Sequence, residues 1–166
     1  NNTVKGYDAV HVVEVNGRLE LWLGEVKFYN DASSAIRDVV TEIQNHTQIN
    51  YMKNEVALIA NKLDKKSKYY PQLSKLLDSN TSLDEVFDSA CIPVLITYDS
   101  KVLKEHAKVT SQFNNELENE VRLVRAKMEE KLAKLSLPVK VHLFLIPLNT
   151  KQILIECLDG KLKGLQ

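Results

Sequence analysis

The stretch YDAVHVVEVNGRLELWLGEVKF, residues 7–28, decides the fold. Both of its halves are rich in β-branched and large apolar residues, which favour strands. The Asn16-Gly17 pair between the halves is the strongest short signal for a two-residue hairpin turn, because such a turn needs positive φ at both positions. We therefore predict a β-hairpin whose strands cover about residues 10–15 and 19–28.

The rest of the chain alternates between helical and strand patterns, judged by the spacing of its apolar residues. The expected elements are a helix at 32–43 that starts near Asp31 or Ser33, a helix at 52–63, short helices after Pro71 and Ser82, a strand at 92–98, a long helix at 111–135, a strand at 139–148 and a last helix capped by Thr150. Strands that alternate with helices predict an α/β fold with a mixed central β-sheet flanked by helices. The hairpin supplies the antiparallel part, and helical crossovers allow the later strands to pair in parallel.

The composition is typical of one domain with a substantial core. The chain has 166 residues, of which 44% are apolar, and Lys plus Arg equals Asp plus Glu at 22 each. A net charge of zero argues against a basic coat for nucleic acid along the whole chain and against an acidic disordered tail. No apolar run approaches the ~20 residues that cross a bilayer, so we expect no membrane association. We expect Cys91 and Cys157 to be reduced, buried thiols of an intracellular protein.

The hairpin brings charged residues together at its open end. With a two-residue turn at Asn16-Gly17, the numbers of paired residues sum to 33, so Asp8 faces Glu25. Lys27 lies on the same side of its strand as Glu25, because strand residues two apart share a face. Two carboxylates ~5 Å apart repel by ~3 kcal/mol at an effective dielectric constant of ~20. A hard divalent cation such as Mg²⁺ offsets this repulsion best, and the carbonyl of Val26 is a further oxygen ligand within reach.

These residues resemble the motif of the PD-(D/E)xK nuclease superfamily, an acid on one strand and Glu-x-Lys on the next. The matching segments are Gly6-Tyr7-Asp8 and Gly24-Glu25-Val26-Lys27, although Tyr7 stands where many members have proline. More narrowly, the run LWLGEVKFY at 21–29 resembles the nuclease-like domain of HamA, the effector subunit of the Hachiman antiphage system. The first resemblance covers about residues 6–50, and the second extends weakly over the remainder.

The resemblance implies a restriction-endonuclease-like fold and metal-dependent hydrolysis of phosphodiester bonds in DNA. It implies that Asp8, Glu25 and the carbonyl of Val26 hold Mg²⁺ (or Mn²⁺), and that Lys27 positions or deprotonates the attacking water. It also implies a helicase partner, HamB, and a bacterial, cytoplasmic protein. Because the chain begins with Asn1 rather than Met, we expect residues 1–166 to be a single nuclease-like domain that lacks upstream elements.

Several other residues are candidate contacts to DNA. They are Gln44 and His46 on the helix after the motif, and Lys62, Lys65, Lys66 and Lys68 near a loop. An ordinary polar helix face and a solvated loop are the alternative interpretations. No motif for reading bases is evident, so cleavage is expected to show little sequence specificity.

Two other functions stay open at this point. The chain could be a non-catalytic regulatory subunit that binds a helicase, or a restriction-type endonuclease. The regulatory subunit needs no metal, and the alternative interpretation of Asp8, Glu25 and Lys27 is a surface cross-strand ion pair at a sheet edge.

Overall fold

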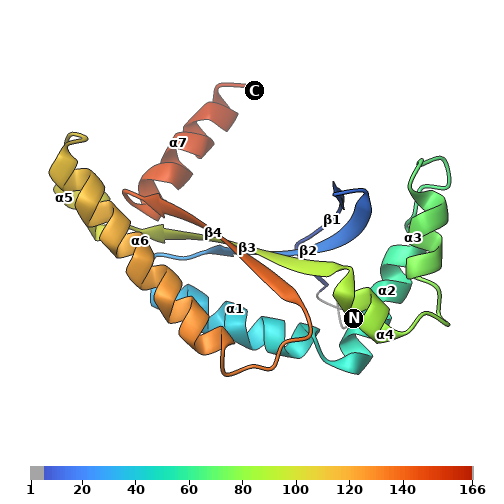
Figure 1. The fold of residues 1–166 in the computed structure, drawn as a ribbon. Coiled ribbons are helices and arrows are strands. Elements are labelled where there is room, and N and C mark those ends of the chain that lie inside the picture. The colour runs from blue at the N-terminus through green and yellow to red at the C-terminus, as the bar shows by residue number, and fades with distance from the viewer. Residues whose placement is uncertain (1–5, 166) are drawn as a thin grey trace. The chain divides into compact units, whose positions relative to one another are not determined.

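The computed structural model describes residues 6–165. Its elements, labelled in Figure 1, are β1 (Ala9–Val15), β2 (Arg18–Phe28), α1 (Ala32–His46), α2 (Ile49–Ala60), α3 (Tyr70–Leu76), α4 (Leu83–Asp88), β3 (Ala90–Asp99), α5 (Lys101–Glu105), α6 (Ser111–Leu132), β4 (Lys140–Leu148) and α7 (Lys151–Lys163). This order of strands and helices confirms the α/β class.

The chain divides into two compact units. Unit 1 comprises the residues up to Glu25 together with Thr41–Val94 and Leu135–His142. Unit 2 comprises Val26–Val40, Leu95–Lys134 and the residues from Leu143 onwards. The strands β2, β3 and β4 each pass from unit 1 into unit 2, so one domain over residues 1–166 stays a prediction.

The hairpin of unit 1 is formed as its turn residues predict. Asn16 and Gly17 have φ values of 51° and 75°, the positive pair that a tight primed turn requires. The antiparallel ladder runs from Val15 paired with Arg18 to Ala9 paired with Gly24. The predicted register is therefore confirmed up to the position next to Asp8 and Glu25.

The four strands form one sheet in the order β1-β2-β3-β4. Near the start of β2, the Leu21 amide donates to the Ser89 carbonyl at 2.7 Å. Near its end, the Tyr29 amide donates to the Thr97 carbonyl at 3.2 Å. Because both partners advance together along the chain, β2 and β3 run parallel, whereas β1 and β2 are antiparallel. The sheet is therefore mixed, as predicted.

The core of unit 1 follows the period of two along β2. Leu21 and Leu23 are buried, and they pack in a core that also holds Ile43, Met52, Ile92 and Val94. A tryptophan on the strand face opposite Glu25 is expected in the core, but Trp22 on that face is only half-buried, so this expectation is wrong. Its ring stacks on His142 with centroids 5.7 Å apart, and its Nε1 donates to Glu20 Oε2 at 3.0 Å.

The core of unit 2 includes one apolar face of α6. Met128 is buried, and Phe113, Leu117, Val121, Val124 and Leu132 on the same face are half-buried. The helix ends at Leu132, three residues before the predicted end, where Ala133 forms the C-cap.

No pattern in the sequence indicated the short helix α5, which lies beside α6 (Figure 1). Its five residues are too few to show a helical period. Contacts with Glu120 of α6 define it instead, because Glu120 Oε2 accepts from the backbone amides of Lys101 and Val102 at 3.1 and 3.3 Å.

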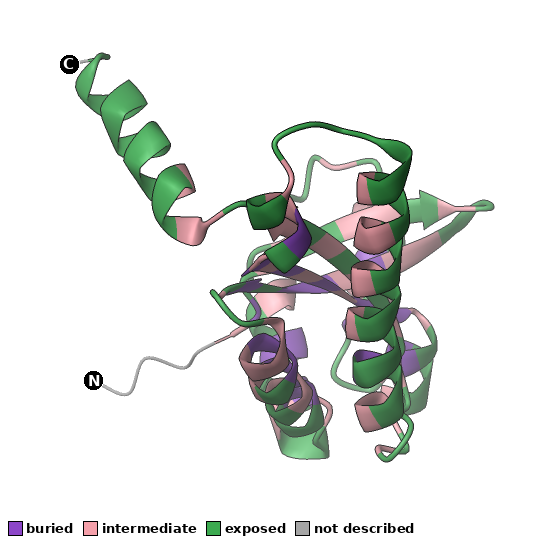
Figure 2. Ribbon diagram, turned by 90° about the vertical axis from the view of Figure 1, so that its left-hand side faces the viewer, coloured by how far each residue is buried: buried purple, intermediate pink, exposed green. Residues whose placement is uncertain are grey.

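Helix α7 carries its apolar side chains on the surface. It contains no buried residue, and Ile153, Leu158 and Leu162 are exposed (Figure 2).

The prediction of two buried thiols holds for Cys91, whose pKa burial raises to about 11. It is wrong for Cys157, which lies on exposed α7. Among residues 6–165, no helix has both the length and the apolar character needed to cross a membrane.

The start of α1 offers a stability prediction. The Ser34 amide donates to Asp31 Oδ2 at 2.7 Å, and hydrogen bonds from Ser34 lower the pKa of Asp31. Replacing Asp31 with alanine should lower the free energy of unfolding by about 1 kcal/mol at pH 7, measured by urea denaturation. A lowered pKa means that this contribution is present above the unfolded value near 4 and is lost as the pH falls through the folded value.

Asp31→Asn is the matched control, because asparagine caps a helix without titrating. It should keep the stability at pH 7 and remove this part of the pH dependence. Equal stability of the alanine and wild-type proteins at pH 7 would contradict the capping role.

Candidate metal and active site

Strand β2 directs Glu25 and Lys27 to its buried face. Glu25 is 3% exposed and Lys27 is 9% exposed, whereas Val26 between them is 45% exposed. The alternation continues the face of Leu21 and Leu23, because successive strand residues point to opposite sides. A carboxylate and an ammonium group thus follow the apolar residues along one face of the strand, where a charged group needs a compensating partner.

Asp8 lies at the other side of the hairpin's open end. It stands one position before Ala9, whose pairing with Gly24 is the last rung of the ladder, so Asp8 itself lies in a bend just beyond the paired residues. Its side chain is exposed and lines a groove of about 620 Å³ in unit 1. The groove also contains Tyr7, Val10, Leu58 and Lys62 among its lining residues. Asp8 is therefore accessible from solvent, whereas Glu25 is enclosed.

The last residue of α1, His46, reaches Glu25. The inward face of α1 carries Ile36, Val39 and Ile43, and His46 follows Ile43 at the helical spacing of three. His46 Nδ1 lies 2.8 Å from Glu25 Oε1, and both side chains are buried. The sequence placed His46 on this helix as a candidate DNA contact, and the structure places its ring in the interior, beside a candidate metal ligand.

Two tyrosines enclose the imidazole of His46. Its ring stacks on Tyr51 with centroids 4.2 Å apart at 14°, and it meets the edge of Tyr7 at 4.9 Å and 74°. Burial raises the pKa of Tyr7 well above its ordinary value, and nearby Tyr51, Glu25 and Glu55 raise it further. Burial, together with nearby acids, raises the pKa of Tyr51 to about 12. Both phenols are therefore neutral near pH 7.

Glu55 is a buried acid that the sequence analysis missed. It lies on α2 between the apolar residues Met52 and Val56, and only 4% of it is exposed. A Cβ atom at Gly6 would come within 3.0 Å of Glu55 Oε2, so glycine allows the chain before Asp8 to pass close to this carboxylate. An acid three residues after Met52, on the apolar face of a predicted helix, was the available signal.

A comparison of the sequence with models of protein families identifies the family of this chain. Residues 1–162 of the 166 match the family model for HamA. The chain belongs to the HamA family. This HamA-family chain is thus a protein of the Hachiman antiphage defence system, which confirms the resemblance seen at residues 21–29. No curated protein and no solved structure matches the chain.

The candidate metal ligands of this HamA-family chain at the hairpin's open end, Asp8, Glu25 and the carbonyl of Val26, are oxygen donors. Within residues 6–165, no group of three or more His, Cys, Asp and Glu side chains is arranged to hold an ion. An ion held by Asp8 and Glu25 would therefore need backbone or water oxygens to complete its ligands. Mg²⁺ is commonly bound in this way, through one or two carboxylates, water and phosphate oxygens.

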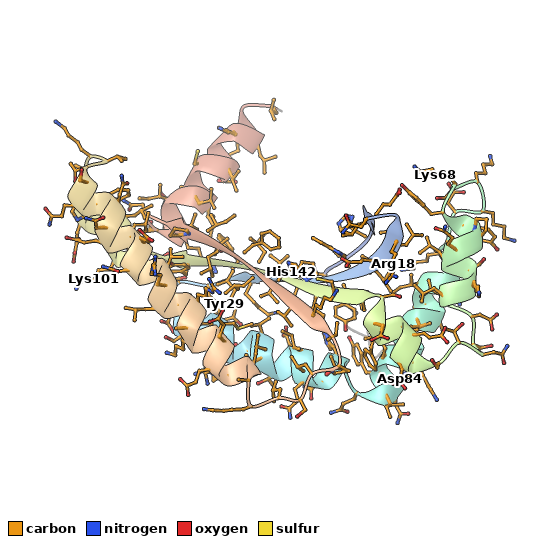
Figure 3. The ribbon with its side chains drawn as sticks, in the orientation of Figure 1. Arg18, Tyr29, Lys68, Asp84, Lys101 and His142 are labelled. Atoms are coloured by element: carbon orange, nitrogen blue, oxygen red, sulfur yellow. The ribbon has the colours of Figure 1, made fainter. Side chains whose placement is uncertain are left out.

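The remaining candidate DNA contacts of the HamA-family chain are on the surface. Gln44 is exposed on α1. Lys62 lines the groove that contains Asp8. Lys65 and Lys66 are exposed between α2 and α3, as is Lys68, which lies over the Tyr69 ring and is labelled in Figure 3. Of this group of lysines, only Lys62 lines the groove that holds Asp8.

Proposed function

We propose that this chain is a metal-dependent DNA nuclease, the effector of its Hachiman complex, acting in the bacterial cytoplasm. The observation that carries the proposal is the register of the hairpin. Its last pair, Ala9 with Gly24, directly precedes Asp8 and Glu25 and so supports bringing these two acids together, and strand alternation turns Lys27 to the same face of β2 as Glu25. Two acids and one ammonium group in this order are the residue types that metal-assisted phosphodiester hydrolysis needs.

In this proposal Asp8 and Glu25, with the carbonyl of Val26, would hold Mg²⁺ or Mn²⁺. Such an ion, when bound, polarises a phosphate oxygen and lowers the pKa of a bound water. As a neutral amine Lys27 would accept a proton from the attacking water, whereas as an ammonium group it would orient that water and favour the negative charge that builds up on the phosphate. Burial of Lys27 supports this role, because a fixed ammonium group in a low dielectric acts more strongly than a solvated one.

The proposal includes a restriction-endonuclease-like arrangement, DNA as substrate and a helicase as partner. A chain with zero net charge binds DNA weakly by phosphate neutralisation alone, so a partner that holds the DNA is part of the proposal. The exposed apolar residues of α7 support the presence of a partner, because single folded chains keep such patches small. Little sequence specificity is expected, since base-reading side chains are not evident.

A metal titration distinguishes the nuclease from a regulatory subunit without metal. We expect the wild-type protein to bind Mn²⁺ in a calorimetric titration, and Asp8→Asn to weaken binding by at least about tenfold, because it removes one anionic ligand. Asp64→Asn is the matched control, since Asp64 also lines the groove and is exposed. Binding that is absent, or that is equal in wild-type and Asp8→Asn proteins, would support the regulatory alternative.

A further inference from the structure

We propose that His46 is a positioning residue that holds the Glu25 carboxylate in the orientation required for metal binding. This inference rests on the proposed function, and it gives His46 a role inside the protein in place of a contact to DNA. In this inference His46 does not bind the metal itself. It contacts Glu25, one of the proposed metal ligands, from helix α1.

The contact between the two residues is close and enclosed. Nδ1 of His46 lies 2.8 Å from Oε1 of Glu25. His46 is 8% exposed and Glu25 is 3% exposed, so little solvent competes for the contact. In an interior of low dielectric, a polar group at this distance strongly biases which way a carboxylate turns.

The imidazole itself has little freedom to move. Tyr51 covers one of its faces at 4.2 Å, and the edge of Tyr7 meets it at 4.9 Å. Tyr51 in turn belongs to α2, whose neighbouring residues Met52 and Val56 are buried. A ring that is already fixed by packing loses less conformational entropy on holding a partner than a mobile side chain does. A residue behind a metal ligand can therefore keep that ligand in one orientation.

The angle between His46 Nδ1 and the Glu25 carboxylate is not yet that of a hydrogen bond. Within residues 6–165, Nδ1 of His46 makes no hydrogen bond of acceptable angle, although Glu25 Oε1 is within hydrogen-bond distance. A small rotation of the carboxylate would complete a bond from Nδ1, and that bond would fix the orientation of the Glu25 carboxylate. Partners of this kind typically change metal affinity 10- to 100-fold when they are removed.

Two substitutions distinguish the contribution of the His46 nitrogen Nδ1 from that of the aromatic ring. His46→Phe keeps an aromatic ring between Tyr7 and Tyr51 but removes Nδ1, whereas His46→Asn restores a donor near the same place. We expect His46→Phe to weaken Mn²⁺ binding about 10- to 100-fold in calorimetry, and His46→Asn to recover most of the loss. At saturating Mn²⁺, the cleavage rate of His46→Phe in the helicase complex should return close to the wild-type value.

The control is His142→Phe, which replaces another histidine stacked on an aromatic ring, Trp22. It should bind Mn²⁺ as the wild type does. Equal binding by His46→Phe and wild type would overturn the positioning role, and so would equal losses in His46→Phe and His46→Asn. These results leave the proposed function intact, whereas unchanged metal binding in Glu25→Gln would defeat the proposed function itself.

Nitrogen-15 spectra of the His46 ring give a second measurement that needs no substitution at His46. Adding Mg²⁺ to the wild-type protein should shift the Nδ1 resonance, and Glu25→Gln should abolish that shift. This decides the question if His46→Phe fails to fold. A Nδ1 resonance that does not respond to Mg²⁺ in a wild-type protein shown to bind the ion would overturn the inference.

Discussion

Glu25→Gln should lower Mg²⁺-dependent DNA hydrolysis by the complete Hachiman complex by at least about 100-fold. Glutamine keeps the shape of the side chain and one oxygen but removes the negative charge. Glu25 is buried beside His46, so no solvated acid can easily replace it at that position. The measurement is the rate of plasmid degradation with the helicase present, at several Mg²⁺ concentrations.

The control for this substitution is Glu20→Gln. Glu20 lies on the same strand as Glu25 but an odd number of residues away, so its side chain points to the opposite face of the sheet. There its Oε2 accepts a hydrogen bond from Trp22 Nε1. We expect its plasmid degradation to equal that of the wild type. If Glu25→Gln degrades DNA at the wild-type rate, Glu25 is not a metal ligand of the reaction.

The largest effect on stability is expected from Leu23→Ala. Leu23 is fully buried in the core of unit 1, on the strand that carries Glu25. Removing its side chain leaves a cavity, because the backbone of a central strand cannot collapse to fill it. The free energy of unfolding should fall by about 2–5 kcal/mol, measured by urea or guanidinium denaturation.

Val10→Ala is the matched control, because Val10 is the cross-strand partner of Leu23 on the edge strand β1. Val10 is 40% exposed, so its substitution should cost much less than that of Leu23. Similar losses in the two variants would show that this face is as well covered at the edge strand β1 as at the central strand β2.

The exposed α7 helix and the position of Trp22 show where prediction from apolar patterns fails. The spacing of Ile153 and Leu158 indicated an apolar helix face correctly, but not whether anything covers it. The same holds for Cys157, which shares that helix. Periodicity identifies a face of an element, whereas burial depends on which other elements pack against it.

The sequence by itself determined the hairpin and the order of its charges. Asn16 and Gly17 set a turn of two residues, and that turn fixed which residues pair as far as Ala9 and Gly24. The period of two then assigned Glu25 to the face of Leu23. These features are local, because they depend on backbone conformation at two positions and on the geometry of a strand.

Only the tertiary structure decided what surrounds Glu25. His46 was visible as a residue on a helix after the motif, but its 2.8 Å approach to Glu25 depends on how α1 packs against the sheet. The stacking of His46 on Tyr51 and the burial of Glu55 under Gly6 depend in the same way on α2. Contacts between distant segments follow from the joint packing of several elements, and no local pattern in one of them encodes the distance to another.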